Sequence, residues 1–158
     1  MSEEKMLFIT EDQAGGQEEV AVEVKTDKYL VFVSDELLYG LYAEQVVEII
    51  TNHTITHLPR VPDYVRGIIN LRGQIIPIVD IRLRLGRPAR EDCCIVVVDV
   101  DGSLVGILVD AVEKMVGIPD ESILPMPTQR GHKMISGMCS LPEGGTVLIL
   151  DCGLLIRG

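Results

Sequence analysis

The sequence predicts a mostly β protein, and three observations lead to this prediction. The core-forming residues are mainly Val, Ile and Leu, because the chain has only two Phe, four Tyr and no Trp; β-branched residues favour strands. Short apolar runs alternate with turn-forming pairs such as Arg72-Gly73 and Asp101-Gly102. The strand pattern also occurs twice along the chain. Short strands at even spacing indicate a barrel or a sandwich.

Length and composition limit the possible protein classes. The chain has 158 residues, is 47% hydrophobic and has a mean hydropathy of +0.29, which fits one domain or two small intertwined ones and argues against disorder. No window reaches the roughly 18 apolar residues of a membrane span. The N-terminus lacks a signal-peptide pattern. We therefore expect a cytoplasmic protein without direct membrane insertion.

Residues 1–28 are predicted to form an acidic, flexible N-terminal extension. They carry eight acidic residues and three lysines, a net charge of −5. The polar, Gly-rich stretch at 13–17 has neither a helical nor a strand period, so we expect mobility unless the extension pairs on a sheet edge. The rest of the chain, 29–158, is the predicted folded domain.

Ten strands and two short helices are predicted after residue 28. The predicted helices, Ile81–Leu85 and Cys152–Ile156, each follow an Asp in the N-cap position, Asp80 and Asp151. Short helices are also expected near Ala43 and at Pro62–Val65. The predicted strands are Tyr29–Val33, Leu37–Tyr42, Val46–Thr51, Arg66–Leu71, Gln74–Val79, Cys94–Val100, Leu104–Val109, Val112–Ile118, Ile135–Cys139 and Thr146–Leu150.

An internal repeat divides the domain into halves of about 29–90 and 91–158. Shifting the chain by 66 residues places Tyr29–Pro59 on Ile95–Pro125, with Gly40 on Gly106 and Val46 on Val112. Each half offers about five strands and ends in an Asp-capped helix. Because a half of this size buries too little surface to be stable alone, we expect the halves to share a core, with each half curled into a small barrel.

No pattern for catalysis, a metal or a cofactor stands out. Phosphate-binding glycine loops, a nucleophile elbow and an HExxH motif are absent from the sequence. His53 and His57 lie in a Thr-rich segment followed by Pro59, so they are interpreted as solvated side chains. The cysteines, at positions 93, 94, 139 and 152, form no CxxC pair and are expected to be buried free thiols. We therefore predict a non-enzymatic protein that presents surfaces to protein partners.

An arginine cluster raises the alternative of nucleic-acid binding. Residues 60–90 hold seven arginines and two aspartates, a net charge of +5, in a chain of net charge −10. Only Tyr64 lies among them, whereas single-stranded nucleic acid is usually bound with several stacking aromatics. Arg82 and Arg84 are interpreted as the solvated face of a helix. Arg72 has two interpretations: an exposed hairpin arginine, or one fixed by a carboxylate, with Glu48 as the plausible partner.

Three segments together resemble the CheW family of chemotaxis coupling proteins. They are Val46-Val47-Glu48-Ile49-Ile50, Leu58-Pro59-Arg60-Val61-Pro62, and the run from Val65 to Asp80 that contains Asn70-Leu71-Arg72-Gly73. Val105–Asp110 and Ser136-Gly137-Met138 extend the resemblance, which covers about Tyr29 to Ile156. It implies two intertwined, five-stranded SH3-like β-barrels with short helices and no catalysis.

The resemblance also implies partners and contact positions. Proteins of this family bridge the cytoplasmic tip of methyl-accepting chemotaxis receptors and the regulatory domain of a CheA-type histidine kinase. It implies a monomer in isolation, ring assembly with the kinase, and a location at receptor arrays. Glu48 and Arg72 match a glutamate–arginine pair of the family. The partner-binding positions that it suggests are Val46, Glu48, Gly67, Arg72, Gly73, Ile75, Cys93, Cys94 and Met115.

Alternatives within the same fold remain open at the level of sequence. The chain could be part of a kinase regulatory domain, an adaptor normally fused to a receiver domain, or a component of a non-flagellar chemosensory system. A nucleic-acid-binding β-barrel is the remote alternative. The chain ends at Gly158 without the longer C-terminal helix of some relatives, and its N-terminal extension is long.

Overall fold

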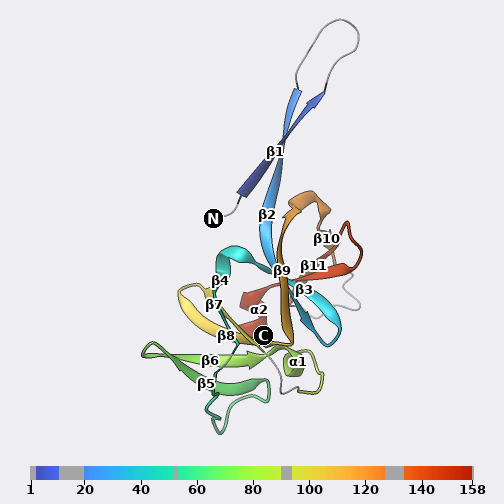
Figure 1. The fold of residues 1–158 in the computed structure, drawn as a ribbon. Coiled ribbons are helices and arrows are strands. Elements are labelled where there is room, and N and C mark those ends of the chain that lie inside the picture. The colour runs from blue at the N-terminus through green and yellow to red at the C-terminus, as the bar shows by residue number, and fades with distance from the viewer. Residues whose placement is uncertain (1–2, 11–19, 52, 90–93, 127–133, 158) are drawn as a thin grey trace, which may run out of the picture.

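The described fold consists of two β-sheets, two short α-helices and two short 3-10 helices (Figure 1). The computed structural model describes residues 3–10, 20–51, 53–89, 94–126 and 134–157, and the side chains of residues 25–156 within these ranges. The strands are β1 Glu3–Thr10, β2 Val20–Ser34, β3 Leu37–Tyr42, β4 Val46–Ile50, β5 Val65–Leu71, β6 Gln74–Asp80, β7 Cys94–Val100, β8 Ser103–Val109, β9 Ala111–Pro119, β10 Leu124–Pro125, β11 Ile135–Ser140 and β12 Thr146–Leu150. The helices are η1 Ala43–Gln45, α1 Ile81–Arg84, η2 Asp120–Ser122 and α2 Cys152–Arg157.

Two five-stranded barrels make up the domain. The first has the strand order β4-β7-β8-β6-β5 and is called the β4 barrel. The second has the order β9-β2-β3-β12-β11, to which β1 and β10 are added, and is called the β9 barrel. Each barrel takes a hairpin from the other half of the sequence. The expectation that each half curls into its own barrel is therefore wrong, whereas two intertwined barrels are confirmed.

Strand registers show that the internal repeat is structural. Ile50 pairs with Ile95 in the β4 barrel, and the residues 66 positions away, Val116 and Tyr29, pair in the β9 barrel. The edge strands β4 and β9 also carry a bulge at the same place in the repeat. Such bulges bend a strand and increase its twist. Sequence duplication thus produces two barrels with the same pairing geometry.

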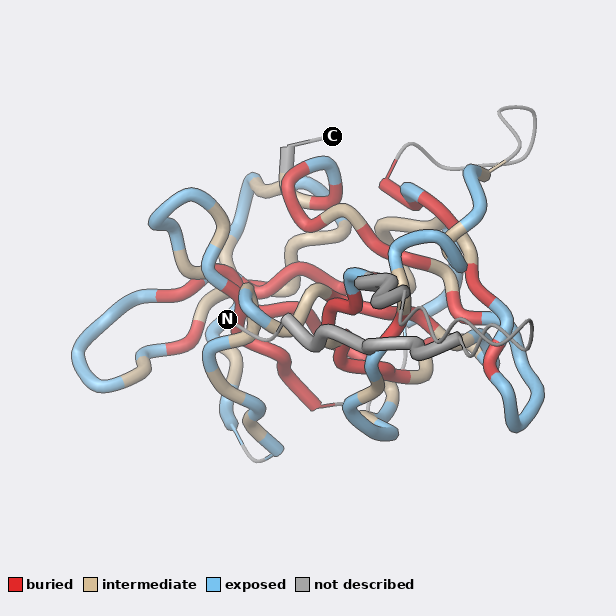
Figure 2. The backbone as a smooth tube through the Cα atoms, turned by 90° about the horizontal axis from the view of Figure 1, so that it is seen from above, coloured by how far each residue is buried: buried red, intermediate tan, exposed pale blue. Residues whose placement is uncertain are grey.

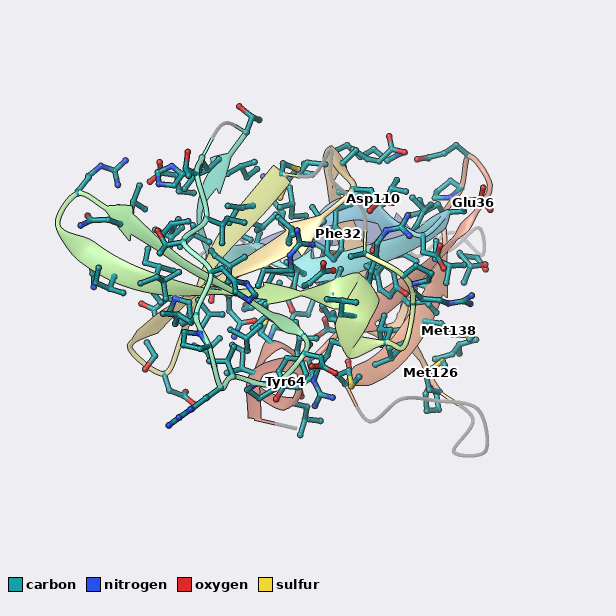
Figure 3. The ribbon with its side chains drawn as sticks, turned by 90° about the horizontal axis from the view of Figure 1, so that it is seen from below. Phe32, Glu36, Tyr64, Asp110, Met126 and Met138 are labelled. Atoms are coloured by element: carbon teal, nitrogen blue, oxygen red, sulfur yellow. The ribbon has the colours of Figure 1, made fainter. Side chains whose placement is uncertain are left out.

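A large core lies where the two barrels meet. Val96 and Val98 of β7 face this shared core, whereas Ile95 and Val97 face the interior of the β4 barrel. Both faces of the strand are buried, which explains the uninterrupted apolar run from Ile95 to Val98. Phe32 of β2 lies in the shared core (Figure 3). Figure 2 shows the buried segments along the centre and exposed turns at the two ends.

Both Asp-capped helices occur as predicted. The carboxylate of Asp80 accepts hydrogen bonds from the backbone N–H groups of Arg82 and Leu83, and the carboxylate of Asp151 accepts one from Leu154 N at 3.1 Å. The short helix near Ala43 is also present as η1. At Pro62–Val65 the prediction of a helix is wrong: the segment is a turn closed by a hydrogen bond from Val65 N to Pro62 O.

The N-terminal extension contains strands that the sequence analysis did not assign. β1 pairs antiparallel with the first half of β2, from Thr10 opposite Val20 to Glu3 opposite Asp27. β2 then continues without interruption into the β9 barrel, so residue 28 lies inside a strand. This ribbon projects from the barrels in Figure 1. The Gly-rich stretch 13–17 lies outside the described residues.

Candidate partner-binding surface

The edge strand β4 forms one side of the candidate surface. It pairs with β7, and the described part of the chain places no other strand beside it. Val47 and Ile49 are large apolar residues exposed on this strand, whereas Val46 packs partly against the shared core. Exposed edge strands with apolar side chains are places where another protein can dock.

An ion pair connects β4 to the tip of the β5–β6 hairpin. Arg72 Nη2 lies 2.8 Å from Glu48 Oε1. The hairpin turns through Arg72 and Gly73, which have φ values of 51° and 82°, as in a two-residue type I′ turn. Gly73 N donates a hydrogen bond to Oδ1 of Asn70, which supports the turn. Because β4 and β5 are the two edges of the sheet, the ion pair links them across the mouth of the barrel.

Exposure indicates that this ion pair contributes little to the stability of the fold. The Arg72 side chain is 70% exposed and that of Glu48 is 29% exposed. Exposed ion pairs typically contribute between about 0 and 1 kcal/mol. Arg72 thus has features of both interpretations: it is an exposed hairpin arginine, and its predicted partner Glu48 is paired with it. Ile75, three residues along the same hairpin, adds an exposed aliphatic side chain.

The backbone conformation and close packing at Gly67 require glycine. Its φ is 148°, and a Cβ atom at this position would overlap the carbonyl oxygen of Thr56. Thr56 and Ile68 exchange two backbone hydrogen bonds, of 2.8 and 2.9 Å, beside it. A side chain at Gly67 would therefore disturb the segment that leads from β4 to β5.

The predicted positions of the second half are not gathered into one surface. Met115 is exposed on β9, the counterpart of β4. Cys94 begins β7 and is buried in the shared core, where burial raises the pKa of its thiol. Cys93 lies outside the described residues. Met115 is thus accessible on the surface, whereas Cys94 is packed inside.

The described cysteines fit structural thiols. Cys94, Cys139 and Cys152 are free and buried, as predicted. Burial raises the pKa of Cys139, and burial together with the charge of Asp151 raises that of Cys152 to about 12. Since the thiolate is the reactive form, these side chains are poor nucleophiles at neutral pH.

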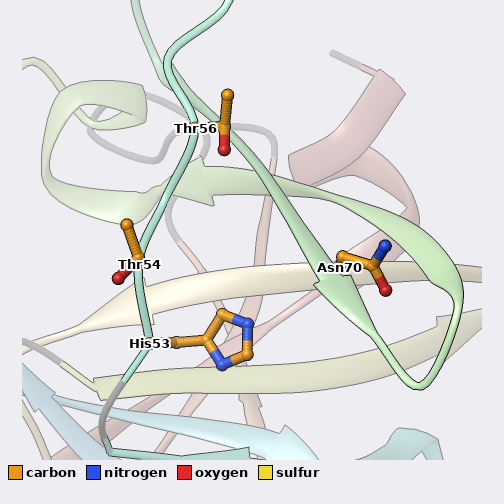
Figure 4. Close-up of a pocket in the computed structure, with 4 residues that line it drawn as sticks. All are labelled: His53, Thr54, Thr56 and Asn70. Carbon is orange, nitrogen blue, oxygen red and sulfur yellow. The ribbon is translucent and has the colours of Figure 1, made fainter.

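A shallow depression beside β5 does not have the residues of a metal site. It is lined by His53, Thr54, Thr56 and Asn70 (Figure 4). In the part of the chain that the structure describes, no group of three or more His, Cys, Asp and Glu residues could hold a metal ion. A ring nitrogen of His57 lies 3.3 Å from the carbonyl oxygen of Arg66. His132 lies outside the described residues.

The interpretation of Arg82 as a solvated residue is wrong. Its Nε and Nη2 donate to the two carboxylate oxygens of Asp110, at 2.8 and 2.7 Å. Its Nη1 donates to Asp35 Oδ1 at 3.2 Å and to Pro88 O at 3.3 Å. Asp35 is in the β2–β3 turn and Asp110 is where the chain crosses from β8 to β9, so Arg82 joins the two barrels.

Arg84 is also engaged within the molecule. Its Nε donates to the carbonyl oxygen of Leu155 in α2 at 3.0 Å, and its guanidinium lies 4.6 Å from the ring centroid of Tyr64. Figure 3 shows Tyr64 beside α2. The excess of positive charge in residues 60–90 indicated that both arginines could have partners elsewhere. It did not identify them, because the carboxylate and carbonyl partners are distant along the chain.

Comparison with known proteins identifies the family of this fold. The model of the CheW family, described as a CheW-like domain, matches residues 28–158. The chain belongs to the CheW-like domain family. It is 28% identical over 136 residues to the chemotaxis protein CheW of Klebsiella aerogenes, with 82% of each chain covered. It is 45% identical over 75 residues to CheW of Rhizobium meliloti, covering 46% of this chain and 48% of that protein.

A solved structure supports the same assignment for the fold. The scaffolding protein TtCheW from Thermoanaerobacter tengcongensis matches with a TM-score of 0.76 and 32% sequence identity, covering 84% of this chain and 93% of that chain. The CheW-like fold thus accounts for both barrels. Among the described residues, no helix is long and apolar enough to cross a membrane.

Proposed function

We propose that this CheW-like protein is a non-enzymatic adaptor that couples chemoreceptor tips to a CheA-type histidine kinase. The observation that carries the proposal is the edge of the β4 barrel, where the Glu48–Arg72 ion pair lies among exposed aliphatic side chains. An apolar patch with a polar rim is the usual composition of a docking surface. The relatives of this chain include several chemotaxis proteins named CheW.

The proposed partners are the kinase regulatory domain and the cytoplasmic tip of a methyl-accepting receptor. The receptor tip is helical in this family, and an amphipathic helix binds by laying its apolar face into a groove. The adaptor itself is a monomer in isolation and joins the kinase in rings at membrane-associated receptor arrays. No cofactor takes part in this role.

The arrangement of the arginine cluster favours this proposal over nucleic-acid binding. Arg66 pairs with Asp80 at 2.9 Å, Arg72 pairs with Glu48, and Arg82 pairs with Asp110. Nucleic-acid affinity depends on cations available to neutralise phosphates, whereas these guanidinium groups are already held by carboxylates of the same chain.

Variants Arg72→Ala and Glu48→Ala test the proposal. Each removes one side of an exposed ion pair, so we expect receptor-stimulated kinase activity to fall while thermal unfolding stays close to that of the wild type. Arg60→Ala is the matched control, since it removes one positive charge from an exposed residue in the same basic segment. Binding of the wild type to each partner is measured separately by pull-down.

The result can contradict the proposal at two levels. Normal coupling by folded Arg72→Ala and Glu48→Ala variants would remove the special role of the ion pair. A wild-type protein that binds neither the kinase regulatory domain nor the receptor tip would overturn the adaptor function itself.

A further inference from the structure

A second ion pair lies on the β9 barrel. It joins Nζ of Lys114, on β9, to Oε1 of Glu143, in the turn between β11 and β12. Both side chains are about half exposed. Neither residue is among the partner-binding positions that the family resemblance suggests.

This ion pair occupies the position of Glu48–Arg72 in the repeat. Lys114 lies 66 positions after Glu48, the shift that relates β4 to β9. The two hairpins are related by a shift of 71, because the parallel pairs Ile78–Gly106 and Ile149–Gly40 correspond. The same shift carries Arg72 onto Glu143.

The correspondence extends to the residues around each ion pair. Gly144 follows Glu143 with a φ of 102°, as Gly73 follows Arg72 with a φ of 82°. Met115 follows Lys114 and is 51% exposed, as Ile49 follows Glu48 and is 42% exposed. Each barrel therefore has an edge strand, a hairpin tip and an ion pair between them, and the next residue of each edge strand is an exposed apolar residue on the opposite face of the strand.

The polarity of the two ion pairs is opposite. On the β4 barrel the edge strand carries the acid and the tip carries the base; on the β9 barrel the edge strand carries the base and the tip carries the acid. Ion pairs this exposed add little to folding stability. Their chief physical consequence is the charge pattern that they present to a partner, and like charges placed opposite one another at an interface are strongly unfavourable.

We propose that the Lys114–Glu143 ion pair is a specificity determinant that makes the two barrel ends non-interchangeable. The repeat gives both edges the same arrangement of strand and hairpin tip, and the reversed ion pair distinguishes them. The β9 edge thereby selects a protein surface that places an acidic group near Lys114, a basic group near Glu143 and an apolar side chain in the recess next to the pair. The inference rests on the proposed adaptor function and deepens it by assigning a partner chemistry to the second barrel.

A recess next to the ion pair suits this assignment. It has a volume of about 220 Å³, and its lining residues are Val31, Leu38, Glu113, Lys114, Leu141, Glu143 and Gly144. The apolar part of the lining is aliphatic, and the charged part holds two carboxylates and one ammonium group. An apolar side chain of the partner can enter the recess only if the partner's charges are complementary to these charged groups. Specificity therefore depends on both the shape and the charge of the partner.

The test is the double reversal Lys114→Glu with Glu143→Lys, compared with each single reversal. The double variant keeps the net charge and can rebuild the ion pair with inverted polarity, so its thermal midpoint should equal that of the wild type. We expect its affinity for the kinase regulatory domain or for the receptor tip to fall at least about tenfold, since the partner's charges now meet like charges. Both affinities are measured separately by calorimetry.

Binding by the double variant decides whether the ion pair sets partner specificity or only closes the barrel. A double variant that binds both partners as tightly as the wild type overturns the inference, because the ion pair would then only close the barrel. Asp63→Lys, at an exposed loop residue, matches the charge change of the single reversal Glu143→Lys and should leave both affinities unchanged. Failure of the proposed function itself is distinguishable, since the wild type would then bind neither partner.

Discussion

Removing Arg82 is expected to destabilise the fold far more than removing Arg72. Both residues are arginines paired with carboxylates, but their surroundings differ. The Arg82 side chain is 13% exposed and that of Asp110 is 5% exposed, whereas the Arg72 side chain is 70% exposed. The variant Arg82→Ala leaves the carboxylate of Asp110 buried without the guanidinium that neutralises it.

The size of the effect follows from this burial. Deleting one partner of a buried ion pair typically destabilises a protein by about 3–5 kcal/mol, because the remaining charge is not solvated. Arg82 makes two hydrogen bonds to Asp110 and one to Asp35, so we expect a loss in this range. Arg72→Ala should change the free energy of unfolding by less than about 1 kcal/mol.

Urea denaturation followed by far-UV circular dichroism measures both changes in the free energy of unfolding. A second variant, Arg82→Met with Asp110→Asn, removes both charges and should recover part of the loss, since no isolated charge remains. A loss below about 1 kcal/mol for Arg82→Ala would contradict the expected destabilisation, because it would mean that the Asp110 carboxylate is effectively solvated.

Three further predictions concern single sites. Gly67→Ala should destabilise strongly in thermal unfolding, because the added Cβ overlaps Thr56 O, whereas Gly73→Ala meets no atom within 4 Å and should have the smaller effect of a left-handed Ala; equal melting points would contradict this. Phe32→Ala, at a fully buried residue, should lose about 3–5 kcal/mol in urea denaturation, and a loss below about 1 kcal/mol would show that the core closes over the gap. Burial raises the pKa of Cys152 from 9.0 to about 12 in the folded protein, so the thiol ionises first in the unfolded protein. The free energy of unfolding should be unaffected below pH 9 and should fall by about 1.4 kcal/mol per pH unit as the pH rises towards 12. The fall should be shallower in Cys152→Ala, and parallel plots of stability against pH for the two proteins would argue against the raised pKa.

Local features were predictable because they depend on neighbouring residues. Asp80 and Asp151 were expected as N-caps, and both carboxylates accept hydrogen bonds from the helices that follow them. The Arg72-Gly73 turn was expected between two apolar strands, and both residues have the positive φ that such a turn needs. In each case the deciding interaction spans three residues or fewer.

Two misassignments have different causes. Arg82 looked like a solvated helix residue because its aspartate partners are 47 and 28 residues away. The strands of residues 3–10 and 20–28 pair locally with each other; they were not predicted because they lie in an acidic segment on both sides of the polar, Gly-rich stretch 13–17. Local pattern cannot reveal a buried ion pair whose members meet only after the barrels assemble.

The sequence by itself determined the β class, the duplication and the candidate pair Glu48–Arg72. The reason is that the alternation of apolar residues, the turn-forming residues and the 66-residue shift can all be recognised from the order of the residues alone. Only the tertiary structure decided which strands share a barrel, since exchange of hairpins between the halves preserves every local pattern. It also decided that Lys114 meets Glu143 with the polarity opposite to that of Glu48 and Arg72. The physical reason is that strand pairing and ion pairing join residues through space, and the same local sequence is compatible with more than one partner.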